Sequence, residues 1–208
     1  AQQSCVVIDW GAGGCSISAT RGGKIVACLG DDDVGGLSID RKVARRLASK
    51  LSRAGGGLAN VNVESDANRY ALLRAASWLK LALLSEGGGA RSDANGGAKA
   101  SVELVVGGGL DDASLEGAAS TVSTEVSLGL GEWEDAAADA FEAVRKLLAA
   151  VIAAAGFAPS EMLHVLTGGG MCRSELVRTM LTRALGDPAT FKLTWLDGKT
   201  SGAGGGGG

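Results

Sequence analysis

An apolar run that stops at an aspartate and a group of small residues most constrains how this 208-residue chain can fold. Residues 6–14 read VVIDWGAGG, and an apolar run bounded by glycine predicts a buried strand that ends in a tight turn. Glycines in such a turn let backbone N–H groups approach an anion closely. The theme recurs at residues 34–36 (VGG) and 165–170 (VLTGGG). Three turns of this kind in one chain predict a cradle for nucleotide phosphates.

The chemistry of the first turn has two interpretations. Asp9 could hold Mg²⁺ or a metal-bound water beside the anion, or it could be a solvated cap at the strand end. The glycines within residues 11–14 could cradle phosphate or form a plain hairpin turn. The acidic run at residues 31–33 could bind a cation, although a charge run of this kind favours a solvated loop.

Composition limits the class of protein. Hydrophobic residues make up 46% of the chain and aromatic residues 4%, so we expect a core of Ala, Leu and Val. A formal net charge of −3 without a basic block argues against nucleic acid as a partner. The longest near-apolar stretch, residues 147–157, is too short to span a bilayer, and no signal peptide is visible. We therefore expect a cytoplasmic domain cut from a longer protein, with no membrane partner.

The cysteines give no sign of a metal centre or a covalent catalyst. They lie at positions 5, 15, 28 and 172 without a CxxC spacing, and His164 is the chain's one histidine. A zinc site and a catalytic triad are therefore not expected. Such spacing favours reduced thiols, and His164, just before an apolar strand, is expected to be structural.

Hydrophobic periodicity predicts strands followed by alternating helices and strands. Strands are expected over residues 5–9, 15–20, 24–29, 100–106, 121–128, 162–167 and 191–196, and helices over 39–53, 66–85, 132–155 and 175–185. Short turns between the first three strands favour a β-meander, and Asp40 is expected to cap the first helix. This order predicts an α/β fold with a mixed sheet covered by helices.

Glycine-rich linkers predict an insertion in that fold. They bound residues 55–129, and such runs are typical of flexible connectors. We therefore expect a sheet-and-helix base from residues 1–54 and 130–208, with an inserted α+β subdomain from 55–129.

The element order and the glycine turns resemble those of the actin-like ATPase superfamily, which has a ribonuclease-H-like fold, and within it the DnaK-type heat-shock 70 chaperones. Residues 7–14 (VIDWGAGG) resemble that family's second phosphate motif, and residues 31–40 (DDDVGGLSID) resemble the segment that follows it. Residues 166–173 (LTGGGMCR) resemble its adenosine motif, and residues 73–85 the long helix of its upper subdomain. The resemblance covers most of the chain but only the second lobe (subdomains IIA and IIB) of the family's nucleotide-binding domain.

The resemblance implies a binding site for ATP or ADP with Mg²⁺. Gly11 and Gly13 would lie against the phosphates, with Asp9 near the metal through a bound water. Gly35 and Gly36 would approach the phosphates from the other side.

The same resemblance implies a border for the adenosine. Gly169 and Gly170 would lie beside it, and the Arg173 guanidinium would stack on the base, unless Arg173 is a surface residue at a helix start. Ser85 would meet the adenosine from the upper helix.

The chain also departs from the family. The departures are Gly14 for Thr, Ser16 for Asp, and Trp78, Leu81 and Ala82 for the Glu, Lys and Arg of the upper helix. Lys80 is charged but lies one position away from the place where the family has a charged contact with the adenosine. Trp78 and Leu81 favour a place in the core or at a subdomain interface. Each lost polar contact removes about 1 kcal/mol of binding energy, so we expect weak nucleotide binding and no measurable hydrolysis.

The resemblance implies a fragment of a stress-response chaperone that supplies one wall of the ATP cleft used in nucleotide-dependent protein folding. No catalytic residue is assigned. The implied partners are the missing first lobe, the peptide-binding domain, and co-chaperones or exchange factors, with the ribosome added for a ribosome-associated branch. Two alternatives are a nucleotide-independent protein-interaction or regulatory lobe and a sugar or acetate kinase of the same fold.

Overall fold

The structure, a computed structural model, describes residues 4–54, 62–84, 91–92, 98–107, 121–158, 163–185 and 191–196. Over these residues it is an α/β protein that divides into two compact units. The first unit comprises Ala1–Gly36 and Asp139–Gly208, and the second comprises Leu37–Ala138. The unit boundaries thus lie after residues 36 and 138, whereas the predicted subdomain boundaries lay after 54 and 129.

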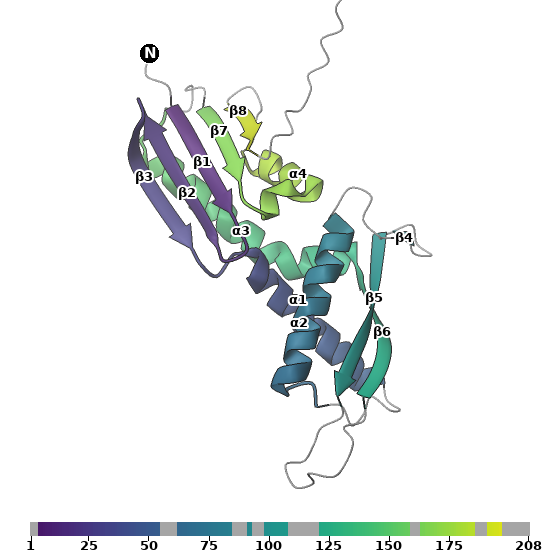
Figure 1. The fold of residues 1–208 in the computed structure, drawn as a ribbon. Coiled ribbons are helices and arrows are strands. Elements are labelled where there is room, and N and C mark those ends of the chain that lie inside the picture. Colours follow the sequence, from purple (N-terminus) through teal and green to yellow (C-terminus); the bar gives the residue numbers. More distant parts are fainter. Residues whose placement is uncertain are drawn as a thin grey trace, which may run out of the picture. The chain divides into compact units, whose positions relative to one another are not determined.

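The first unit is built on a five-stranded mixed sheet with the order β3-β2-β1-β7-β8 (Figure 1). β1 (Ser4–Trp10), β2 (Cys15–Arg21) and β3 (Lys24–Asp31) form an antiparallel meander. β7 (Leu163–Gly168) and β8 (Phe191–Trp195) extend the sheet in parallel from β1. The predicted mixed sheet and its leading meander are therefore confirmed.

The alternation of β1 explains how this sheet is anchored. Ile8 and Trp10 are fully buried, whereas Asp9 between them is exposed, as expected for a strand with one covered face. The Trp10 indole Nε1–H donates to the carbonyl oxygen of Val34 at 2.8 Å. Its ring also packs edge-on against Phe141 of the helix α3 (Leu130–Ala154), with ring centroids 4.9 Å apart. The end of β1 is therefore held rigidly in the core.

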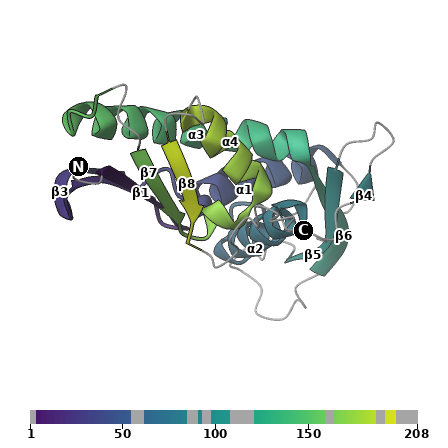
Figure 2. The ribbon, with the colours of Figure 1, turned by 90° about the horizontal axis from the view of Figure 1, so that it is seen from above.

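Helices cover this sheet. α3 (Leu130–Ala154) runs along one of its faces from Asp139 onward (Figure 2), and α3 is followed by Gly156, whose φ of 62° suits a helix C-terminus. A short 3₁₀ turn (Met171–Arg173) then leads from β7 into α4 (Glu175–Leu185). α4 has the bounds that the sequence predicted.

The second unit combines two helices with a small antiparallel sheet. Its helices are α1 (Gly36–Ala54, from Leu37 onward) and α2 (Asp66–Leu84), and its sheet has the order β4-β5-β6. These strands span Arg91–Ser92, Ala98–Gly107 and Thr121–Gly129, and the two-residue β4 was not predicted. The buried Asn68 amide joins α2 to β5, because it donates to and accepts from the Gly107 backbone at 2.9 Å.

The prediction that Asp40 caps the first helix is wrong. α1 begins at Gly36, so Asp40 lies inside the helix, where it is buried. Its Oδ2 forms a salt bridge with Lys80 Nζ of α2 at 2.7 Å, and burial raises the pKa of the Asp40 carboxyl. The acidic side chain thus joins two helices of the second unit. Within the described ranges, no helix has the length and hydropathy needed to cross a membrane.

Candidate functional site

The first two glycine turns are packed directly against each other. The Gly11 N–H donates to the Gly14 carbonyl at 2.9 Å and closes the first turn, and the Gly36 N–H donates to the Gly11 carbonyl at 3.0 Å. A Cβ added to Gly35 would collide with the carbonyl oxygen of Ala12 and the backbone nitrogen of Gly14. Only glycine allows the second turn to approach the first this closely.

The third glycine turn lies against the end of β1. Gly169 has a φ of 88°, and a Cβ there would collide with the Trp10 carbonyl group. The same Cβ would lie 2.7 Å from Oδ1 of Asp9. The parallel pairing of β1 with β7 places Asp9 opposite Gly168, immediately before this turn. The bends at residues 11, 35 and 169 therefore lie around the end of one strand.

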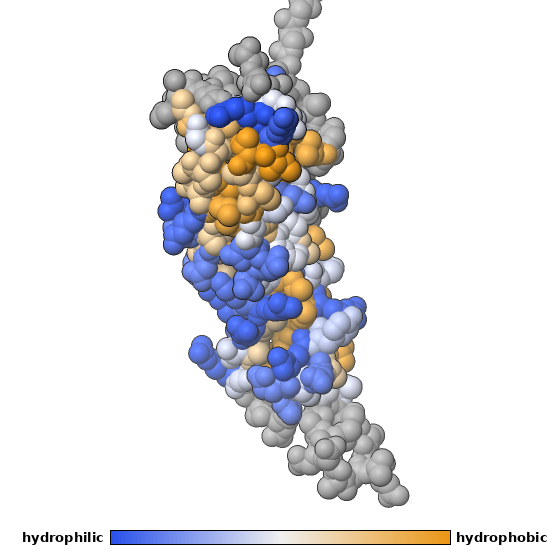
Figure 3. Space-filling model, turned by 90° about the vertical axis from the view of Figure 1, so that its left-hand side faces the viewer, coloured by the Kyte–Doolittle hydropathy of each residue, from blue (hydrophilic) through white to orange (hydrophobic). Residues whose placement is uncertain are grey.

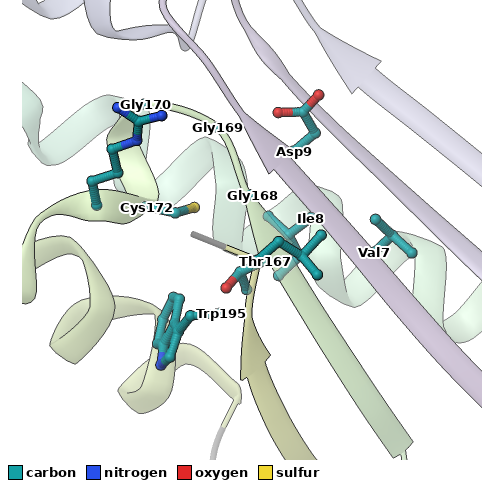
Figure 4. Close-up of a pocket in the computed structure, with 11 residues that line it drawn as sticks. Val7, Ile8, Asp9, Thr167, Gly168, Gly169, Gly170, Cys172 and Trp195 are labelled. Atoms are coloured by element: carbon teal, nitrogen blue, oxygen red, sulfur yellow. The ribbon is translucent and has the colours of Figure 1, made fainter. Parts of the chain in front are cut away.

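A pocket of about 400 Å³ opens beside this point of convergence (Figure 4). It is lined by Val7, Ile8, Asp9, Thr167, Gly168, Gly169, Gly170, Cys172, Arg173, Trp195 and Leu196. β1, β7 and β8 are parallel, so their carboxyl ends meet at one edge of the sheet. In open α/β sheets this edge is where ligands bind.

The predicted site residues fall into two groups and one exception. Asp9, Gly169, Gly170 and Arg173 line the pocket. The glycines of the first two turns are close to the end of β1 but do not line the pocket; they are Gly11, Gly13, Gly35 and Gly36. Ser85 lies outside the described residues. Nucleotide binding by any of these residues stays a prediction.

Sequence reasoning missed an aromatic wall of the pocket. Trp195, at the end of β8, lines the cavity, and the Arg178 guanidinium carbon lies 4.8 Å from the centroid of its ring. The Arg178 Nε–H also donates to the Cys172 carbonyl at 2.9 Å, which fixes the guanidinium over the indole. Thr167, also missed, is buried at the end of β7. The available signal was their position at the ends of predicted strands.

The ionisable groups around the pocket limit its chemistry. Asp9 and Arg173 are exposed and bring opposite charges to the lining. Burial raises the pKa of Cys172 to about 11, and Asp9 raises it as well, so this thiol stays protonated at neutral pH. In the ranges that the structure describes, no cluster of three or more His, Cys, Asp or Glu side chains could hold a metal ion. A cation beside Asp9 would therefore need ligand oxygens and waters to complete its coordination.

The upper helix departs from the expected arrangement. Trp78 is 49% exposed and Leu81 is 59% exposed, so the interpretation of these residues as core is wrong, whereas their alternative place at a subdomain interface stays a prediction. Helical spacing alone did not reveal which face of α2 is covered. Lys80 is engaged with Asp40, and His164 lies within β7 without lining the pocket.

A comparison of the sequence with models of known protein families gives no match. A search of curated proteins finds none with significant similarity.

Proposed function

We propose that this chain is the second lobe of the nucleotide-binding domain of a divergent chaperone similar to the heat-shock 70 family. The lobe supplies one wall of a cleft for ATP or ADP with Mg²⁺. The observation that carries the proposal is the convergence of the turns at Gly11, Gly35 and Gly169 around the end of β1. Glycine turns at the carboxyl end of a buried strand let a phosphate approach the backbone closely, because they carry no side chains. The Gly11 and Gly36 N–H groups donate to the carbonyls of Gly14 and Gly11, so other N–H groups of the turns would bind the phosphates.

We assign the adenosine to the part of the pocket that lies away from the glycine turns. The pocket volume of about 400 Å³ is within the range of small-molecule sites. The base would stack beside Trp195 and Arg173, and the phosphates would extend toward the glycine turns. Bound Mg²⁺ would offset phosphate charge, and Asp9 would hold it through water.

The sheet agrees with the ribonuclease-H-like part of the proposal. A meander followed by two parallel strands places the ends of β1, β7 and β8 together. We further propose a cytoplasmic location, and as partners the first lobe, the peptide-binding domain and co-chaperones or exchange factors.

Hydrolysis by this lobe alone is not expected. Gly14 and Ser16 replace the polar residues that the family motif carries after its glycines, and the Cys172 thiol is protonated. The opposing wall of the cleft would belong to the first lobe. Release of phosphate from ATP by the purified chain above the buffer rate would contradict this part of the proposal.

Isothermal titration of the chain with ATP·Mg²⁺ tests the binding site. We expect saturable binding that weakens when EDTA removes the metal, and that weakens in Asp9→Asn and Arg173→Ala. Arg183→Ala is the matched control, because Arg183 is exposed on α4 and does not line the pocket. A folded chain that gives no binding heat, or variants that bind like the parent, would overturn the proposal.

A second candidate is a nucleotide-independent protein-interaction lobe. Ile25, Val26 and Leu29 are all exposed on β3, and apolar colour gathers over this edge of the sheet in Figure 3. An exposed apolar edge strand can pair with another chain. This function would be favoured if the chain does not bind ATP·Mg²⁺ and if it forms a complex with another protein chain that is lost in Ile25→Lys.

A further inference from the structure

A second cavity, within the second unit, lies between α1 and the start of α2. This α1–α2 groove has a volume of about 390 Å³. Arg41 and Arg45 of α1 line it on one side, and Arg69 and Tyr70 of α2 line it on the other. All four side chains are exposed, and Tyr70 is 65% exposed. The groove is therefore a basic site with an aromatic residue at its rim.

The arginines of the groove are not neutralised within the described part of the chain. None of Arg41, Arg45 and Arg69 forms a salt bridge with a described residue, whereas Lys50, on the same α1, pairs with Glu132 at 2.6 Å. Arg41 and Arg45 are one helical turn apart, where like charges repel. An anionic occupant would relieve that repulsion. The charge of the groove thus indicates an acidic partner.

The floor of the groove distinguishes between acidic partners. It is apolar, and the residues that form it are Ala44, Ala48, Val63, Leu72 and Leu73. Glu64, the one acidic residue among the described residues that line the groove, would repel any anionic occupant and does not distinguish between them. A nucleic acid would leave the apolar floor unused, whereas an amphipathic peptide would cover it.

We propose that the α1–α2 groove docks a short acidic, amphipathic segment of a partner protein. Its carboxylates face Arg41, Arg45 and Arg69, and its apolar side chains cover the floor. Tyr70 supplies an aromatic contact of the kind that is enriched at protein interfaces. All of these residues belong to the second unit, so the inference does not depend on nucleotide binding.

Fluorescence anisotropy with the full chain tests this proposal. The probe is a fluorescein-labelled peptide with Glu and Leu at helical spacing, and the second probe has Ser in place of each Leu. We expect saturable binding of the first probe that weakens as salt is added, and weaker binding of the second. Each of Arg41→Ala, Arg45→Ala and Arg69→Ala should weaken the affinity by about two- to fivefold, the effect of one exposed ion pair.

A charge-matched variant serves as the control. Arg45→Glu should reduce binding further than Arg45→Ala, whereas Arg53→Glu should leave it unchanged, because Arg53 is exposed on the same helix but does not line the groove. Circular dichroism melts establish that each variant is folded. Equal binding by Arg45→Glu and the parent, or no binding by the parent, would overturn the proposal. The proposal would also be overturned if the Ser-containing peptide and an oligothymidylate bound as tightly as the Leu-containing peptide, because the groove would then be a general polyanion site.

Discussion

Oδ1 of Asp9 lies against the backbone of Gly169, at a distance of 2.7 Å from the point that a Cβ on residue 169 would occupy. The Asp9 carboxylate therefore occupies the space that a side chain at position 169 would need. Removing that space should affect both the folding of the first unit and the shape of the pocket.

Gly169→Ala should lower the free energy of unfolding by about 2 kcal/mol or more, because the φ of 88° and the collision with Trp10 both oppose a side chain. Gly170→Ala is the matched control, since Gly170 has a helical φ of −62° and a Cβ there meets open space. It should change the stability by less than about 0.5 kcal/mol. Urea denaturation measures both, and equal losses would show that Gly169 is not packed as described.

Lys80→Met should destabilise the second unit by about 3 kcal/mol, because it leaves the buried Asp40 carboxylate without its partner. Replacing both residues, as Asp40→Leu with Lys80→Met, should recover most of that loss. Thermal melts of the single and double variants check this. If the single variant melts like the parent, the ion pair between α1 and α2 is not formed in solution.

The buried thiols should resist alkylation in the folded protein. Burial raises the pKa of Cys15 to about 12 and that of Cys172 to about 11, whereas Cys28 is exposed. Iodoacetamide at pH 8 should therefore label Cys28 first, as mass spectrometry of the peptides would show. Labelling of Cys15 and Cys172 at the rate of Cys28 before any urea is added would contradict this burial.

The same thiols predict how stability changes at alkaline pH. The folded state holds the Cys15 and Cys172 protons more tightly than the unfolded state, in which a thiol has its ordinary pKa of 9.0. Their contribution to stability is thus fully present below pH 9.0 and is lost as the pH rises toward 11 and 12. A Cys172→Ala variant should show a shallower decline than the parent over that range.

Glu132 should stabilise the start of α3. Its Oε2 accepts the Gly129 N–H at 2.9 Å, which is the reciprocal half of a capping box, and its carboxylate also pairs with Lys50. Glu132→Ala should cost about 1 kcal/mol in urea denaturation, and Glu132→Gln should cost less because its amide oxygen can still accept the bond. Glu134→Ala is the control within the same turn, and an equal loss there would exclude a specific role for Glu132.

The local patterns of the chain predicted its elements well. The apolar run before Gly11 and the short turns after it were sufficient for the meander, because strand and turn signals are encoded by neighbouring residues. The resemblance placed the turns at Gly35 and Gly169 around one nucleotide, but it did not predict that Gly35 packs directly against the first turn or that Gly169 packs against the end of β1. The sequence pattern by itself indicated the turns but not that they meet.

Other features depend on tertiary contacts that a sequence pattern does not specify. Asp40 looked like a cap because Asp is common there, yet a lysine 40 positions later allows it to be buried inside the helix. The exposure of Trp78 reflects which face of α2 packs on β5, and periodicity does not choose that face. Trp195 could not be predicted to line the pocket without knowing the order of β1, β7 and β8 in the sheet.

The indole of Trp10 gives the first unit an intrinsic optical reporter. Its N–H is bonded to the residue that precedes Gly35, and its own carbonyl touches the turn at Gly169. A movement of either segment would alter the surroundings of this chromophore and shift its emission. Spectra of a variant that keeps Trp10 as its sole tryptophan would thus follow any rearrangement at the strand end without an added label.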